Sequence, residues 1–304
     1  MIKILDKSFP STDGKHSLVG KLYIPEGEPK AIFHHVHGMT DHIARYESFL
    51  TEMAENGYLC VAYDNLGHGH TAVNREELGF IAHKDGWKIL AEDVFSTSQL
   101  MKKEFPELTY YLMGHSMGSF IVRLAAYLHP ELQDKLVVMG TGGPNTAFQP
   151  ALFMINVLKR VYGEKHISPF LEGIAFGAYN KRFGGDVAGD WLSKNPEVRK
   201  KFDADEFCNF HFTVSALYDL VKLNAVVNSK KVYSGTRGSL PILLVSGADD
   251  PVGDYGKGVR KVYENLSRYV DDVRIKIYDD NRHELLNDTA RGEVIKDILE
   301  FLKA

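Results

Sequence analysis

The stretch Leu-Thr-Tyr-Tyr-Leu-Met-Gly-His-Ser-Met-Gly, residues 108–118, decides the fold. Residues 108–113 form a short apolar run that is typical of a buried strand. A helix-period pattern follows over residues 117–128. Gly114-His-Ser-Met-Gly118 lies between them and fits the pattern G-x-S-x-G, which places a serine at a sharp strand-to-helix turn with its hydroxyl exposed. The sequence therefore predicts that Ser116 is a nucleophile at the carboxyl end of a strand.

Short apolar runs alternate with longer helix-period segments on both sides of this turn. An exposed antiparallel strand pair is expected near residues 16–25. Such alternation implies an α/β fold with a mostly parallel central sheet covered by helices on both faces. The strands are predicted over 31–37, 58–64, 108–113, 135–139, 242–246 and 273–278, and the helices over 43–56, 85–105, 117–128 and 290–303.

The alternation stops between about Pro144 and Gly238, where the pattern is mostly helical and rich in aromatic residues. We interpret this segment as a helical cap inserted between two core strands. The predicted domains are therefore a first core part over 1–144, a cap over 145–237 and a second core part over 238–304. At least three or four of the cap's aromatic side chains are expected to line an apolar cleft against the sheet, and the others to form a small core within the cap.

Composition excludes several classes of protein. The 304 residues include 36 Lys+Arg and 40 Asp+Glu, a formal charge of −4, and no long basic run that would favour nucleic acid as a partner. The two cysteines, Cys60 and Cys208, are too few and too far apart for a disulfide framework. The chain shows neither a signal peptide nor an apolar run of about 18 residues, so a cytoplasmic protein without a transmembrane segment is expected. No oligomeric state is predicted.

A serine hydroxyl needs a base, and the base needs an orienting acid. In the order typical of a G-x-S-x-G turn, the acid and then the histidine follow the nucleophile along the chain. His283 comes after the last predicted strand and is the only histidine beyond residue 211, so we predict it as the base. The acid is Asp249 or Asp250, which both follow strand 242–246. Asp250 is favoured because Pro251 biases it toward an extended conformation.

A serine nucleophile that attacks a carbonyl group also needs two backbone amides to bind the oxyanion that forms. One is expected from Met117, the residue after the nucleophile. The second is expected from the loop His37-Gly-Met-Thr40, which follows strand 31–37, and Met39 is the predicted donor. No cofactor and no metal ion are expected in this chemistry.

These residues resemble the α/β-hydrolase superfamily. The segment His37-Gly-Met-Thr-Asp-His-Ile-Ala-Arg-Tyr46 and the loop Asp64-Asn-Leu-Gly-His-Gly69 are similar to motifs of its monoacylglycerol lipase and lysophospholipase group, a set of serine aminopeptidase S33-type hydrolases. The resemblance implies an acyl ester as the small-molecule substrate, transient contact with a lipid surface as an option, and a cap that sets substrate preference. For Asp41 and Arg45 it implies bracing of the oxyanion loop, although a surface ion pair between positions i and i+4 is a sufficient explanation.

Two other functions remain open. The pairs His35 and His37, and His68 and His70, suggest a metal hydrolase, but the further ligands expected of one are absent at matching spacing. An aminopeptidase would use the same triad and cap, and would need acidic residues to hold a substrate amine. The candidates in the cap are Glu164, Glu172, Asp203, Asp205 and Glu206.

Overall fold

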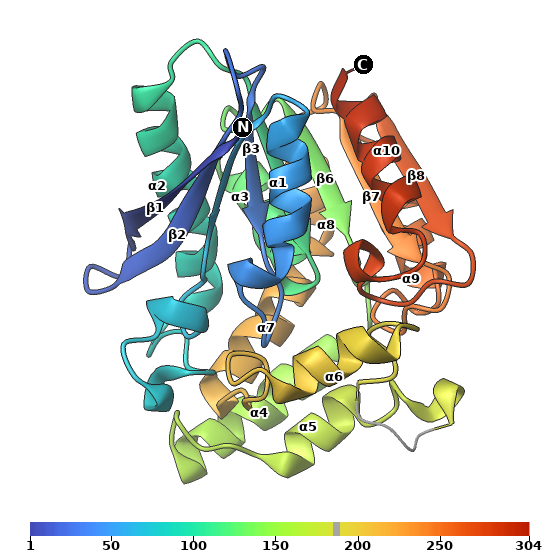
Figure 1. The fold of residues 1–304 in the computed structure, drawn as a ribbon. Helices are drawn as coiled ribbons and strands as arrows, with labels where there is room; N and C mark the ends of the chain where they lie inside the picture. The colour runs from blue at the N-terminus through green and yellow to red at the C-terminus, as the bar shows by residue number, and fades with distance from the viewer. Residues whose placement is uncertain (185–188, 304) are drawn as a thin grey trace.

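One sheet forms the centre of the protein, which we describe from a computed structural model over residues 1–184 and 189–303 (Figure 1). Its strand order in this described part is β1-β2-β4-β3-β5-β6-β7-β8. The β1–β2 and β2–β4 pairs are antiparallel and all other pairs are parallel, which confirms the predicted mostly parallel sheet. The strands are β1 (Lys3–Pro10), β2 (Ser17–Ile24), β3 (Ile32–Val36), β4 (Leu59–Tyr63), β5 (Tyr110–His115), β6 (Lys135–Met139), β7 (Ile242–Gly247) and β8 (Val273–Tyr278).

The antiparallel pair at the start of the chain differs from the prediction. Residues 16–25 supply only β2, and the partner strand is the earlier β1, with Lys3 opposite Ile24 and Pro10 opposite Ser17. The turn between them is fixed by Asp13, whose carboxylate accepts hydrogen bonds from the amides of Lys15 and His16. Because β1 is an edge strand with mostly exposed side chains, it lacks the apolar alternation by which a strand is recognised.

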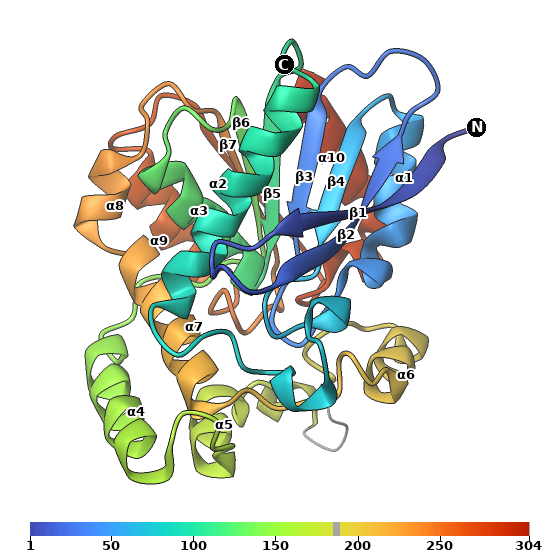
Figure 2. The same cartoon turned by 90° about the vertical axis from the view of Figure 1, so that its left-hand side faces the viewer.

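Helices cover both faces of the sheet (Figure 2). One apolar core lies under α2 (Gly86–Glu104), α3 (Met117–Leu128) and α9 (Lys257–Leu266). The other lies under α1 (Glu47–Glu55) and α10 (Arg291–Lys303). The inner strands β3, β4 and β7 are buried along their whole length, as expected for parallel strands covered on both faces. The predicted helix 43–56 is divided in the structure, because a 3-10 turn over Ile43–Tyr46 precedes α1.

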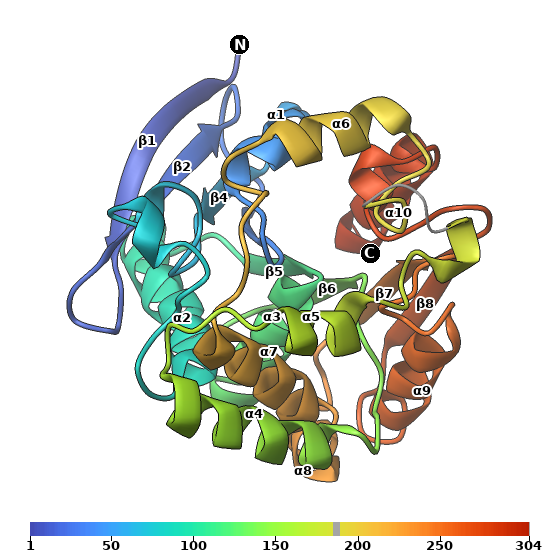
Figure 3. The same ribbon diagram turned by 90° about the horizontal axis from the view of Figure 1, so that it is seen from below.

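A helical insertion separates β6 from β7. Figure 1 places α4, α5 and α6 beyond the carboxyl ends of the strands, and Figure 3 views them from that end. Ser168, Asn195 and Thr213 begin three of the helices, each with a side-chain oxygen that accepts a hydrogen bond from an amide of the first turn. Helix α7 packs on both α4 and α3, so it links the insertion to the core. The helices are α4 (Phe148–Tyr162), α5 (Pro169–Phe176), α6 (Pro196–Ala204), α7 (Val214–Val227) and α8 (Lys230–Gly235).

Several aromatic side chains of the insertion are on its surface. Phe153 is 75% exposed, Phe170 63% and Tyr162 61%, so these rings do not form the small internal core that was expected of them. They lie on α4 and α5, two helices that cover the core with one face and leave the other in solvent. Within residues 1–184 and 189–303, no helix combines the length and the apolar character needed to cross a bilayer.

Candidate active site

Ser116 lies at the junction of β5 and α3 in a backbone conformation that residues other than glycine rarely adopt, with φ 55° and ψ −121°. Its amide donates to the carbonyl of Met139 on β6 (3.0 Å). The flanking glycines make the turn possible. A Cβ at Gly114 would lie 2.2 Å from the carbonyl oxygen of Gly118, and one at Gly118 would lie 2.1 Å from that of Val36. The sheet therefore holds the serine in the strained turn that the motif predicts.

His283 and Asp250 meet at the same edge of the sheet. Asp250 follows β7 and His283 follows β8, and His283 Nδ1 lies 2.9 Å from Asp250 Oδ2. Both side chains are buried. The other carboxylate oxygen of Asp250 accepts the amide proton of Val252 (2.9 Å). The His283 ring also packs against Trp191 of the insertion, with 5.0 Å between ring centroids.

Asp249 occupies a different environment. Its carboxylate faces the guanidinium of Arg182 (3.4 Å), and its side chain keeps 24% of its surface exposed. Its backbone amide donates to the carbonyl of Asn281. Of the two acids that the sequence left open, the structure thus brings Asp250, and not Asp249, to the imidazole.

The two predicted oxyanion amides belong to segments that border Ser116. A Cβ on Gly38 would lie 3.0 Å from the Cβ of Ser116, so the loop after β3 passes directly beside the serine. Met39 and Met117 line one cavity together with Ser116 and His283. Within the described part of the chain, neither the Met39 amide nor the Met117 amide donates a hydrogen bond to a protein acceptor. Both remain available to a ligand oxygen.

The cavity has a volume of about 880 Å³, within the usual range for small-molecule sites. Side chains of α4, α5 and α7 make one wall of it apolar, among them Ile155, Leu171 and Leu217. Besides Trp191, five aromatic residues of the insertion also line it, which confirms the expectation of at least three or four. These are Phe148, Phe176, Tyr179, Phe202 and Phe210.

Two of the five acidic residues considered for binding an amine line this cavity, Glu172 and Asp203. Glu172 is already paired with His211, 2.9 Å away. The other three acids are used elsewhere. Glu164 pairs with His83, Asp205 with His42 and Glu206 with Arg75.

A buried ionic network lies beside the candidate oxyanion loop. Arg45 donates to Asp41 (3.0 Å) and, through its other terminal nitrogen, to both carboxylate oxygens of Glu284 (2.7 and 2.8 Å). Burial alone would raise the pKa of Asp41, but the nearby Arg45 guanidinium and other donors hold it well below its usual range. The Arg45–Asp41 pair is therefore buried, whereas a simple ion pair between positions i and i+4 would lie on the surface. Sequence reasoning missed Glu284 as a partner, although it directly follows His283.

This network reaches the backbone of His283. The Tyr46 hydroxyl donates to Asp41 (2.6 Å) and lies 2.8 Å from Nδ1 of His115. The other ring nitrogen of His115 lies 3.2 Å from the carbonyl oxygen of His283. Burial, together with the neighbouring His283, lowers the pKa of His115 to about 4, so this ring is neutral at neutral pH. The loop after β3 and the loop after β8 are therefore joined by the Arg45–Glu284 pair, and the single N–H of the neutral His115 ring serves one of its two neighbours.

Replacing Arg45 by Ala should lower the free energy of unfolding by about 3–5 kcal/mol at neutral pH, because two buried carboxylates lose their cation. Since the pKa of Asp41 is depressed by folding, the network stabilises the wild type above about pH 4 and ceases to do so as the pH falls through the folded pKa. Urea unfolding at a series of pH values measures this. Arg291→Ala is the control, since its pair with Glu52 is about one-third exposed, and it should cost less than about 1 kcal/mol. Equal losses in the two variants would contradict the assignment.

One histidine of each pair considered for a metal hydrolase, His37 and His68, makes hydrogen bonds within the protein. His37 donates from Nδ1 to the carbonyl of Gly38 and accepts the amide proton of Asn65 at Nε2. His68 donates from Nδ1 to the carbonyl of Leu66. Burial lowers the pKa of His37 to about 3, so the ring is neutral. Among the residues that the structure describes, the group with metal-ligating spacing lies elsewhere and consists of His42, Asp205 and Cys208.

Comparison with known proteins places these features in a family. Residues 27–290 match the profile described as "Serine aminopeptidase, S33". The monoglyceride lipase of Rattus norvegicus is 26% identical over 278 residues, which cover 90% of this chain and 82% of that protein. The monoacylglycerol lipase of Mycolicibacterium smegmatis is 23% identical, over 96% of this chain and 98% of the relative. A thermostable carboxyl esterase from Bacillus coagulans superimposes with a TM-score of 0.93 at 29% identity, over 100% of this chain and 99% of that one. The chain thus belongs to the serine aminopeptidase S33 family of hydrolases and has the α/β-hydrolase fold.

Proposed function

We propose that this protein hydrolyses carboxylic esters with Ser116 as nucleophile, His283 as base and Asp250 as orienting acid. The observation that carries the proposal is a shared cavity, in which a strained serine and a histidine paired with a buried aspartate line the wall next to an apolar surface. The proposed substrates are monoacylglycerols, lysophospholipids or similar acyl esters. The names of the lipase and esterase relatives support this choice over amide cleavage.

In the proposed mechanism, Ser116 Oγ attacks the ester carbonyl carbon while Nε2 of His283 takes the hydroxyl proton. Asp250 holds the imidazole with its other proton on Nδ1 and stabilises the cation that forms. The amides of Met39 and Met117 receive the oxyanion, and each donor contributes about 3 kcal/mol in comparable sites. His283 then gives its proton to the departing alcohol, leaving an acyl-serine. Water, deprotonated by His283, attacks this second ester, and the acid leaves as Ser116 regains its proton.

The apolar wall built by α4, α5 and α7 is the proposed site of the acyl chain. Burial of each methylene contributes about 0.8 kcal/mol, so turnover should rise with chain length until the wall is filled. Polar residues that also line the cavity, among them Asn145 and Asn224, are the proposed surroundings of the alcohol.

The test is hydrolysis of a chain-length series of p-nitrophenyl esters, beside an amino-acid p-nitroanilide. Ester turnover with a chain-length optimum and little anilide turnover is the expected result. The next assay compares monoacylglycerols with lysophospholipids and decides the alcohol. Anilide turnover without ester turnover would overturn the proposal in favour of an aminopeptidase, for which Glu172 and Asp203 are the candidate amine ligands.

A further inference from the structure

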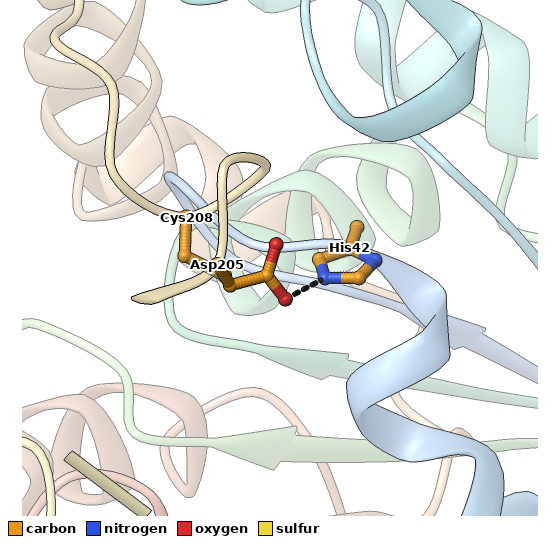
Figure 4. Close-up of side chains that lie close together, drawn as sticks. All are labelled: His42, Asp205 and Cys208. Carbon is orange, nitrogen blue, oxygen red and sulfur yellow. Dashed lines mark hydrogen bonds and ion pairs between the residues drawn. The ribbon is translucent and has the colours of Figure 1, made fainter. Parts of the chain in front are cut away.

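Three side chains with metal-ligating atoms meet where the insertion touches the core. His42 belongs to the loop after β3, whereas Asp205 and Cys208 belong to the turn after α6. His42 Nε2 lies 2.8 Å from Asp205 Oδ2, and one potential ligand atom from each of the three residues lies within 4.8 Å of the other two. Figure 4 shows Asp205 between Cys208 and His42. The proposed ester chemistry uses none of the three.

Hydrogen bonds within the turn fix the positions of Asp205 and Cys208. The amide of Cys208 donates to the carbonyl of Asp205 (3.0 Å), and the amide of Phe207 donates to Asp205 Oδ1 (2.9 Å). Asp205 therefore presents its second oxygen, Oδ2, to His42. The Cys208 side chain is buried, and within the described part of the chain its sulfur makes no hydrogen bond. The backbone thus positions Asp205 and Cys208, and the Cys208 sulfur has no hydrogen-bond partner among the described residues.

The surrounding charges favour a cation. The charged groups that face Cys208 are the carboxylates of Asp41, Asp205 and Glu284, opposed by the single guanidinium of Arg45. Burial and these carboxylates raise the pKa of the Cys208 thiol, so the sulfur carries its proton when no cation is bound. A bound metal ion reverses this preference, because a coordinated thiol is deprotonated.

We propose that His42, Asp205 and Cys208 form a binding site for a thiophilic divalent cation of the Zn²⁺ type, which ties the helical insertion to the loop after β3. The ion binds His42 Nε2, Asp205 Oδ2 and the Cys208 thiolate, and the thiol proton leaves to solvent. Tetrahedral zinc sites place their ligand atoms roughly 3.3–3.8 Å apart, so the 2.8 Å contact between His42 and Asp205 opens when the ion binds. Cys208 lines the main cavity, from which water supplies the fourth ligand.

Such an ion would act as a reversible inhibitor. His42 is three residues from Met39, so the ion would fix the loop of the proposed oxyanion donor to the insertion, and in many enzymes the elements that cover a site open and close during turnover. This effect on turnover rests on the proposed ester hydrolysis, whereas binding of the cation does not. The two claims therefore have separate readouts.

The experiment titrates the metal-free protein with Zn²⁺ by calorimetry and, separately, with Co²⁺ by absorption spectroscopy. One equivalent should bind per chain, with release of protons that depends on pH and, for Co²⁺, with a thiolate charge-transfer band. Cys208→Ser should abolish the band and weaken Zn²⁺ binding about 100-fold or more. Asp205→Asn is a second variant that should also weaken binding, which keeps the test valid if Cys208→Ser does not fold.

Cys60→Ala is the matched control, because Cys60 is the other free thiol and lies buried within β4. It should retain the wild-type band and affinity. Absence of binding to the wild type would overturn the site, as would a band that survives Cys208→Ser or disappears in Cys60→Ala. If the protein hydrolyses esters as proposed, Zn²⁺ should inhibit ester hydrolysis by the wild type and by Cys60→Ala but not by Cys208→Ser. Inhibition that persists in Cys208→Ser would assign the effect to His283 instead.

Discussion

Ser116→Ala is expected to lower kcat/KM for the best ester by about 10⁴- to 10⁶-fold while the protein stays folded. Removal of the nucleophile leaves only the amides and the binding cavity, which in serine hydrolases retain a small residual catalysis. The free energy of unfolding should change by less than about 1 kcal/mol, because alanine has the same Cβ and meets the same strain at φ 55°. Steady-state kinetics and urea unfolding measure the two quantities on the same preparation.

Ser98→Ala is the matched control for this variant. Ser98 is a buried serine on α2, and its hydroxyl donates to the carbonyl of Phe95. Helix α2 contributes no residue to the turn at Ser116 or to the cavity lining. It should retain kcat/KM within a few-fold. A fluorophosphonate reagent should label the wild type and Ser98→Ala, but not Ser116→Ala. Near-normal turnover by Ser116→Ala would refute the proposed nucleophile.

The elements that local patterns encode were predicted well. The G-x-S-x-G turn requires specific residues at adjacent positions, because only glycine fits beside the carbonyls that crowd Gly114 and Gly118. The inner strands β4 and β7 are short, buried and mostly apolar runs, so their sequences are distinctive. The edge strand β1 has no such signature and was missed, since an exposed strand is defined by its partner and not by its own residues.

Contacts between distant segments were the least predictable. Glu284 and Arg45 are separated by 239 positions, and nothing local to either residue specifies the other as partner. The same holds for His42 and Asp205, which are 163 positions apart. Exposed rings such as Phe153 were also misassigned, because a sequence pattern gives the apolar content of a helix but not whether another element covers it.

The choice between two neighbouring acids has a direct test, for which the chain supplies its own control. Asp250→Asn is expected to lower kcat by about 10⁴-fold with little change in KM, because the amide NH₂ facing Nδ1 favours the wrong imidazole tautomer. Asp249→Asn should change kcat by less than about threefold, since its carboxylate faces Arg182 and not His283. Steady-state kinetics of both variants on one p-nitrophenyl ester measures the contrast.

Because the two substitutions are the same chemical change at adjacent positions, a general effect on the loop after β7 would appear in both variants. The two carboxylates differ in their partners, since Asp250 contacts His283 and Asp249 faces Arg182. A large loss in Asp249→Asn with a small one in Asp250→Asn would contradict the assignment, and so would equal losses. If only Asp250→Asn loses activity, the imidazole depends on the carboxylate 2.9 Å from its Nδ1. His283 then acts as a base that Asp250 orients. The loss would then have to lie in kcat, since Asp250 is fully buried behind His283 and is not among the residues that line the cavity.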